Sequence, residues 1–180
     1  MMQVLKDRLP DIKTVLPVYA VLVFMLYGWM TIVFFWKMTA WLFYLNLGEI
    51  GIVYSYGVFN EFVESVIYIF LLLMLTVALP PSFLRDKFQT RGTLIASFFL
   101  GVVYFMSYLI AFQEVNRLKA ALFSLVVFGV LSMLLFWMSM KFSFVEKSLI
   151  FMTDQLKIFL YVYAPITVIS TFVVLFRMIG

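Results

Sequence analysis

Residues 15–36 read VLPVYAVLVFMLYGWMTIVFFW, an uninterrupted apolar run that ends at Lys37. A helix needs about 20 apolar residues to cross about 30 Å of hydrocarbon, so this run is long enough to span a membrane. Its apolar residues do not alternate with polar ones, which is the pattern of a spanning helix and not of a barrel strand. The run therefore predicts a first transmembrane helix.

Four further apolar runs of similar length follow along the chain. They cover residues 62–79, 93–112, 120–140 and 158–176. The second run ends at Pro80 and Pro81, which disfavour a continuing helix. Because backbone groups in lipid need internal hydrogen-bond partners, we expect these runs to be helices packed in one bundle. The sequence predicts a single all-α domain over residues 1–180, an integral membrane protein with about five transmembrane helices.

The overall composition supports lipid as the solvent for most of the chain. Of the 180 residues, 66% are hydrophobic and 12% are charged, and the mean hydropathy is +1.11. Soluble domains are closer to half apolar and one quarter charged. A domain of this size has too much surface to hide such an excess in its core.

The segment 38–60 interrupts the pattern of spanning runs. It is rich in Trp and Tyr, which prefer the membrane interface, and it carries Asn46, Gly48 and Glu49 near its middle. It also follows the first run with almost no loop. We therefore expect an interfacial or re-entrant element at 38–60 that does not cross the membrane.

A second segment, 142–157, has the pattern of an amphipathic helix. Its apolar residues recur at three- and four-residue spacing and so share one helical face: Phe142, Val145, Leu149, Met152 and Leu156. Its charged residues fall mostly elsewhere. The pattern favours an interfacial helix at 142–157, and the alternative is an extension of the fourth or fifth run.

The distribution of Lys and Arg predicts an orientation. With five spans, one side holds nine basic residues: Lys6, Arg8, Lys13, Arg85, Lys87, Arg91, Lys141, Lys147 and Lys157. The other side holds four: Lys37, Arg117, Lys119 and Arg177. Because cytoplasmic loops are enriched in Lys and Arg, we expect a prokaryotic plasma membrane protein with a cytoplasmic N-terminus and an outer C-terminus.

The candidate functional residues form a polar cluster on the outer side. It consists of Glu49, Asn60, Glu61 and Glu64. An ionisable side chain inside a membrane is a functional candidate, and Glu64 would lie about 6 Å into the second run, at 1.5 Å per residue. The alternative is structural, because Asn60 suits a helix N-cap and acidic residues stabilise a first turn.

Three basic residues between the second and third runs are candidate contacts for anionic lipid: Arg85, Lys87 and Arg91. The alternative for them is ordinary anchoring on the cytoplasmic side.

Small residues at four-residue spacing are candidates for close helix packing in the third run. Ser97 is followed by Gly101, and Ser107 is followed by Ala111. Such pairs let helices approach closely in lipid, either within the bundle or against a partner chain.

The residues available for catalysis are few. The chain has no Cys and no His, which excludes thiolate sites and removes the commonest metal ligand and general base. No motif for phosphate binding or nucleophilic catalysis is present, and we expect no enzyme activity, no cofactor, no metal and no nucleic-acid partner.

Three functions remain open on this basis. The first is a non-catalytic membrane subunit that packs against a partner membrane protein. The second is a small oligomeric transporter or channel with Glu64 or Glu49 near its pathway. The third and most remote is a lipid-handling membrane enzyme or a fragment of one. The expected partners are the lipid bilayer and either a second membrane protein or further copies of this chain.

Overall fold

The computed structural model describes residues 9–80, 83–113 and 115–179. This part of the chain folds into five helices without a strand: α2 (Ile12–Trp41), α3 (Leu47–Ala78), α4 (Phe88–Gln113), α5 (Arg117–Lys141) and α6 (Ser143–Ile179). Each helix is long and apolar enough to cross a membrane. The prediction of an all-α integral membrane protein with five spanning helices is confirmed.

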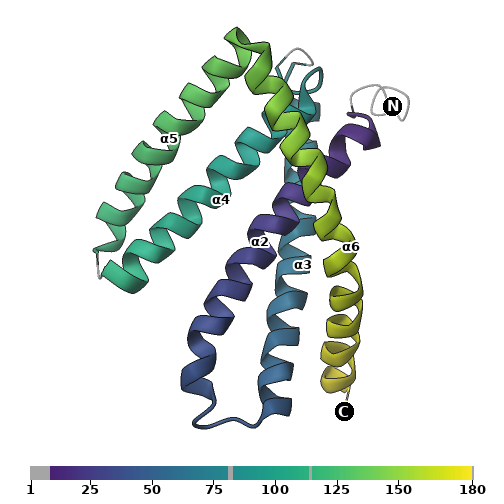
Figure 1. The fold of residues 1–180 in the computed structure, drawn as a ribbon, viewed down its shortest axis with the longest axis vertical. Coiled ribbons are helices and arrows are strands. Elements are labelled where there is room, and N and C mark those ends of the chain that lie inside the picture. Colours follow the sequence, from purple (N-terminus) through teal and green to yellow (C-terminus); the bar gives the residue numbers. More distant parts are fainter. Residues whose placement is uncertain (1–8, 81–82, 114, 180) are drawn as a thin grey trace.

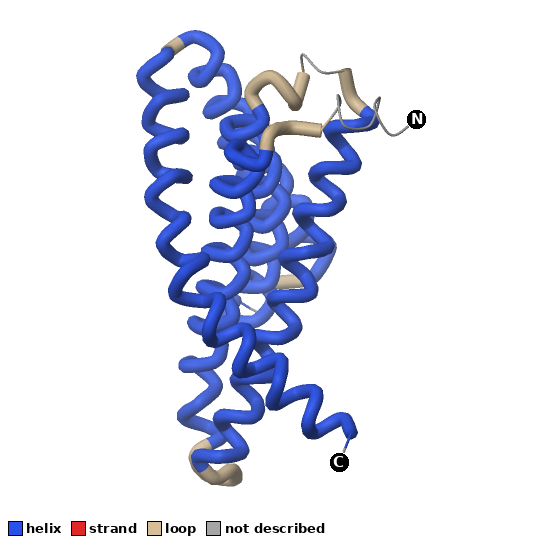
Figure 2. Tube along the Cα trace, turned by 90° about the vertical axis from the view of Figure 1, so that its right-hand side faces the viewer, coloured by secondary structure: helices blue, strands red, loops and turns tan. Residues whose placement is uncertain are grey.

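The helices divide into a core bundle and a hairpin. α2, α3 and α6 pack against one another and form the core bundle. α4 crosses α2 and pairs with α5, and this α4–α5 hairpin diverges from the core bundle at its lower end (Figure 1). α5 contacts α4 extensively and α6 more sparingly. The helices run alternately in opposite directions, so the start of α2 and the end of α6 lie at opposite ends of the molecule (Figure 2).

Segment 38–60 contains the end of one helix and the start of the next. The expectation of a separate interfacial or re-entrant element there is therefore wrong. α2 continues to Trp41 and α3 begins at Leu47, with a short turn between them. The Asn46 side chain accepts from the Glu49 amide at 2.9 Å, and Glu49 accepts from the Asn46 amide at 2.8 Å. This reciprocal capping box satisfies amides that a helix start otherwise leaves unpaired. The polar residues therefore start a spanning helix.

Segment 142–157 is not a separate interfacial helix either. The structure agrees with the alternative, in which this segment extends the fifth run. It forms the first part of α6, which has 37 residues and is therefore about 55 Å long at 1.5 Å per residue. Its side chains hold the start of α4: Lys87 pairs with Glu146 at 2.7 Å, and the Gln89 amide donates to Thr153 Oγ1 at 2.8 Å. These contacts tie the hairpin to the core bundle.

Small and hydroxyl residues fill many of the contacts between helices. The buried polar residues among those described are all Ser or Thr. Ser65 and Ser124, which are fully buried, donate to carbonyls three and four residues earlier in their own helices. Their polar groups are thus satisfied locally, and their small size lets the helices approach closely.

Candidate functional site

The relative positions of α2 and α3 fix the depth of the acidic residues. Two contacts show which residues of these antiparallel helices are level with each other. Toward the start of α2, the Tyr19 hydroxyl lies 3.1 Å from Ser65 Oγ. Eleven residues later, the side chain of Met30 lies against Gly57. Glu61 and Glu64 fall between these two contacts, and we call them the acidic pair.

The acidic pair is level with the middle of α2. Tyr19 and Met30 lie on either side of the midpoint between Lys13 and Lys37, the basic residues near the two ends of that helix. Because α3 begins at Leu47, Glu61 is about 21 Å from its start at 1.5 Å per residue. The sequence reading, which placed Asn60, Glu61 and Glu64 near the outer surface, is therefore corrected: they lie in the middle third of α3.

The acidic pair has few polar partners in this chain. The Asn60 amide donates to Glu64 Oε1 at 2.8 Å. Among the residues that the structure describes, none donates a hydrogen bond to Glu61, and none forms a salt bridge with either carboxylate. Both side chains are partly buried, and they lie close enough to Tyr68 and to Tyr104 of α4 to interact electrostatically with these phenols. α3 makes few contacts with α4.

Two hydroxyls on the neighbouring helices α4 and α2 also lack a hydrogen-bond partner within the described part of the chain. The buried Tyr104 Oη and Thr31 Oγ1 have no hydrogen-bond partner among the described residues. The Tyr104 ring stacks on Trp29 with its centre 5.0 Å from the Trp29 ring centre. A buried hydroxyl without a partner is uncommon and points to a water, an ion or a further group beside it.

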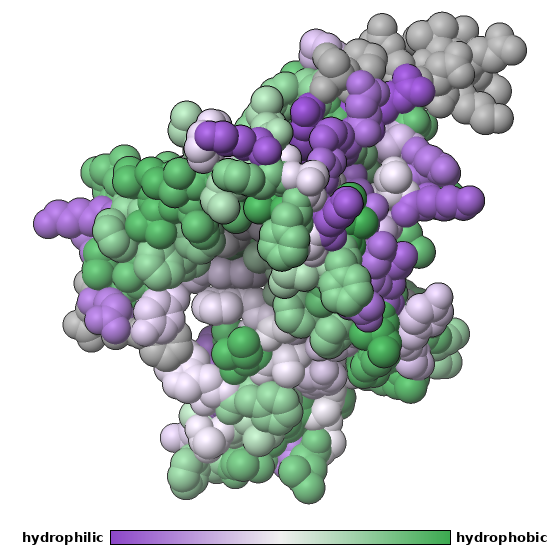
Figure 3. Space-filling view, turned by 45° about the horizontal axis from the view of Figure 1, so that its top comes forward, coloured by the Kyte–Doolittle hydropathy of each residue, from purple (hydrophilic) through white to green (hydrophobic). Residues whose placement is uncertain are grey.

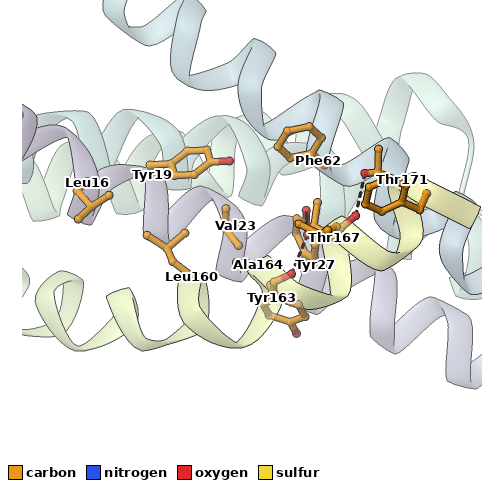
Figure 4. A pocket seen from close by; sticks show the side chains of 12 residues that line it. Leu16, Tyr19, Val23, Tyr27, Phe62, Leu160, Tyr163, Ala164, Thr167 and Thr171 are labelled. Carbon is orange, nitrogen blue, oxygen red and sulfur yellow. Dashed lines mark hydrogen bonds between the residues drawn. The ribbon is translucent and has the colours of Figure 1, made fainter. Parts of the chain in front are cut away.

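A pocket of about 470 Å³ lies between α2, α3 and α6 (Figure 4). Its walls are mainly apolar, but Tyr27 and Thr167 lie 2.9 Å apart across it. Because the Thr167 hydroxyl donates to the Tyr163 carbonyl, its oxygen accepts from Tyr27. No sequence pattern predicted these tyrosines and threonines, since nothing in their spacing distinguishes them from other aromatic and small residues of a spanning run.

Glu49 does not belong to the acidic pair. It lies in the first turn of α3, twelve residues before Glu61, which is about 18 Å along the helix. Its carboxylate accepts from the Asn46 amide in the capping box. Glu49 therefore stabilises the start of α3.

The three basic residues predicted to contact lipid lie at one end of the molecule, where hydrophilic side chains gather (Figure 3). Arg85 is exposed, and Lys87 is paired with Glu146. Arg91 is partly buried: its guanidinium donates to the Phe83 carbonyl and lies 5.5 Å from the centre of the Phe136 ring. The three residues therefore differ in their surroundings, and only Arg91 faces α5.

The small residues of α4 also divide by position. Gly101 is buried, and the Phe128 ring of α5 comes so near that a Cβ at Gly101 would lie 2.3 Å from it. Ser97 and Ser107 are partly buried, and Ala111 is exposed. Gly101 is thus a point of close approach between α4 and α5.

The chemistry within reach of this site is limited to carboxylates and hydroxyls. Among the described residues, no group of three or more Asp or Glu side chains is placed to hold a metal ion. The acidic pair is suited to binding a cationic group or to exchanging protons. A scan against protein-family models and searches of curated proteins and of solved structures found no match to this chain.

Proposed function

We propose that this chain is a non-catalytic membrane subunit that packs against a partner membrane protein and stabilises or anchors it. The observation that carries the proposal is the acidic pair, Glu61 and Glu64. It lies level with the middle of α2 and has no salt bridge with any described residue. A Lys or Arg on a spanning helix of the partner would supply the missing charge.

The energetics favour a protein partner over lipid at this position. An ionised carboxylate at the centre of a spanning helix costs about 2.5–3.5 kcal/mol on insertion scales, and acyl chains offer it no hydrogen bond. The large apolar surface of α5 does not support the proposal in the same way, because acyl chains are as apolar as the side chains they cover. The polar residues therefore distinguish a protein partner from lipid, whereas the apolar residues do not.

A small oligomeric transporter or channel is a second candidate, favoured by the unpartnered hydroxyls of Tyr104 and Thr31. Together with the acidic pair, these groups would suit a hydrated path for a cation or a proton. In that case the partner is a second copy of this chain, and Glu61 and Glu64 take part in transport.

The decisive experiment makes three measurements on each of these variants: Glu61→Gln, Glu64→Gln and the double variant. These are thermal stability of the isolated chain in mild detergent, retention of the complex isolated from the native membrane, and cation and proton flux in liposomes. The subunit proposal predicts that the double variant loses the complex while the isolated chain keeps its stability. Restoration of the complex by exchanging Glu64→Lys with Lys→Glu or Arg→Glu in the partner would identify the contact.

Glu49→Gln is the matched control. It lies on the same helix, and Gln can replace Glu in a capping box, so the complex and the flux should both be unchanged. Loss of flux with an intact homo-oligomer would favour the transporter over the subunit. If the double variant changes neither the complex nor the flux, both proposals are wrong.

We further propose that the end with the start of α2 faces the cytoplasm of a prokaryotic cell. The support is the excess of Lys and Arg at this end. Because the chain has no Cys, single cysteines at Asp86 and at Phe43 can be labelled without background. The cysteine at Phe43 should react with an impermeant reagent in intact cells, and the cysteine at Asp86 should react only after lysis. The reverse pattern would invert the orientation.

A further inference from the structure

An apolar groove runs along the hairpin, between α4, α5 and the end of α3. It has a volume of about 440 Å³, and Leu94, Ile95 and Phe98 of α4 face Gly129, Met133 and Phe136 of α5 across it. A second hollow of about 490 Å³ continues it toward the charged end and shares Phe83, Arg91 and Phe136 with it. We call the two together the α4–α5 groove.

The apolar part of the α4–α5 groove fits within one leaflet of a bilayer. Along α5 it extends from Phe136 to Gly129, which is about 10 Å of helix at 1.5 Å per residue. Half of a hydrocarbon core of about 30 Å is about 15 Å. At the end beside Gly129, the groove closes where the Phe128 ring covers Gly101. A spanning helix of another protein would need contacts through both leaflets, whereas a single acyl chain needs only one.

The charge in the groove lies at Arg91, where its two hollows meet. Arg91 lines both hollows, and its guanidinium lies against the Phe136 ring and donates to the Phe83 carbonyl. Basic residues near the end of an apolar span mark the headgroup level of a bilayer. A cation thus stands at headgroup level, beside an apolar hollow that extends from Phe136 to Gly129.

We propose that the α4–α5 groove binds one anionic phospholipid. The headgroup phosphate lies at the Arg91 guanidinium, whose planar N–H groups suit phosphate oxygens, and one acyl chain lies between α4 and α5. This inference goes beyond the proposed function and does not depend on it. It distinguishes Arg91, which lines both hollows, from Arg85 and Lys87, which line neither.

The test uses the full chain, stripped of lipid in a neutral detergent. Dioleoyl phosphatidylglycerol and dioleoyl phosphatidylcholine are titrated separately, and bound lipid is counted by native mass spectrometry alongside the thermal midpoint. We expect the anionic lipid to bind about fivefold more tightly, which corresponds to about 1 kcal/mol for one basic residue at the surface. Arg91→Gln should remove this preference, and Arg85→Gln should keep it.

Gly129→Leu tests the acyl channel without altering the charge. A Cβ at Gly129 meets no atom within 4 Å, so this position of the groove has room for an added side chain. It should weaken binding of both lipids about equally. Gly51→Leu is the matched control, because Gly51 is an exposed helical glycine outside the groove with equally open surroundings. It should leave binding of both lipids unchanged.

Three results would overturn the proposal. The first is equal binding of the two lipids by the unaltered chain. The second is inorganic phosphate raising the thermal midpoint as much as phosphatidylglycerol does, because the ligand would then be a free anion. The third is unchanged lipid binding in Gly129→Leu. The occupant of the groove would then be a protein helix or unspecific lipid. If Arg91→Gln fails to fold, Gly129→Leu and its control Gly51→Leu decide the question.

Discussion

α2 and α5 are both apolar enough to span a membrane, yet the protein buries them to very different extents. α2 has eight buried residues, and most are large or branched apolar side chains. α5 has three, which are Ala120, Ser124 and Ser139. In water such an imbalance would leave α5 unstable, but in a bilayer its exposed side chains meet acyl chains of the same polarity. Hydropathy thus identifies the helices in the membrane, whereas packing decides which of them form the protein interior.

The largest effect should come from overfilling the core bundle at α2. Ala20 is fully buried, so Ala20→Leu forces extra atoms into packed space and should cost about 3 kcal/mol of unfolding free energy. Ala111→Leu makes the same change at an exposed position of α4 and should cost almost nothing. Titration with dodecyl sulfate in mixed micelles measures both. Equal losses would mean that α2 is no more central than the hairpin.

A smaller effect is expected from Gly101→Ala in the hairpin. The new Cβ would lie 2.3 Å from the Phe128 ring, so the ring must move, at an expected cost of about 1–2 kcal/mol. Phe128→Leu removes the obstructing ring, and the double variant should regain most of the loss. A double-mutant cycle on the unfolding free energy measures this coupling. Strict additivity would contradict the close contact between α4 and α5.

The tyrosine that joins α2 to α6 should contribute less. Tyr27→Phe removes the hydrogen bond to Thr167, and such bonds between membrane helices average about 0.6 kcal/mol. The control is Tyr161→Phe, because the Tyr161 side chain is largely exposed on α6. Unfolding free energies of the two variants should differ by about that amount. A loss for Tyr161→Phe as large as that for Tyr27→Phe would remove the distinction between core and lipid-facing tyrosines.

The smallest effect is expected at the ion pair between the hairpin and the core bundle. Lys87→Gln breaks the 2.7 Å salt bridge to Glu146, and because the pair is partly exposed it should cost about 0.5 kcal/mol. The loss should shrink as salt is raised from low to molar concentration, since salt screens exposed charges. Lys147→Gln is the control, because Lys147 forms no ion pair with a described residue. A salt-independent loss at Lys87 would indicate packing, not charge.

The sequence predicted the number of spanning helices well and their boundaries less well. Continuous apolar runs define the spans, but Asn46 and Glu49 could be read either as interfacial residues or as a capping box. The structure shows the capping box, which lengthens α3 and moves Glu64 from its expected edge to its middle. The depth of the acidic pair depends on the contact between Tyr19 and Ser65, which lie 46 residues apart in the chain. No local pattern predicts such a contact.

The charges of the hairpin residues were visible in the sequence, but their surroundings were not. Arg85, Lys87 and Arg91 have the same charge and lie within seven residues of one another. Their separation into an exposed, a paired and a groove-lining residue depends on Glu146 and Phe136, which belong to other helices. Side-chain roles that arise from contacts between distant segments therefore require the folded structure.

The length of α6 has a consequence for the membrane itself. Lys157 and Arg177 stand twenty residues apart on this helix, which corresponds to about 30 Å, the usual thickness of a hydrocarbon core. The turns before Lys157 then project beyond the acyl chains. A thicker bilayer would bring one of these charges against hydrocarbon or would have to thin locally, at a cost of fractions of a kcal/mol per Å. Hydrophobic mismatch along α6 therefore gives this chain a preferred bilayer thickness.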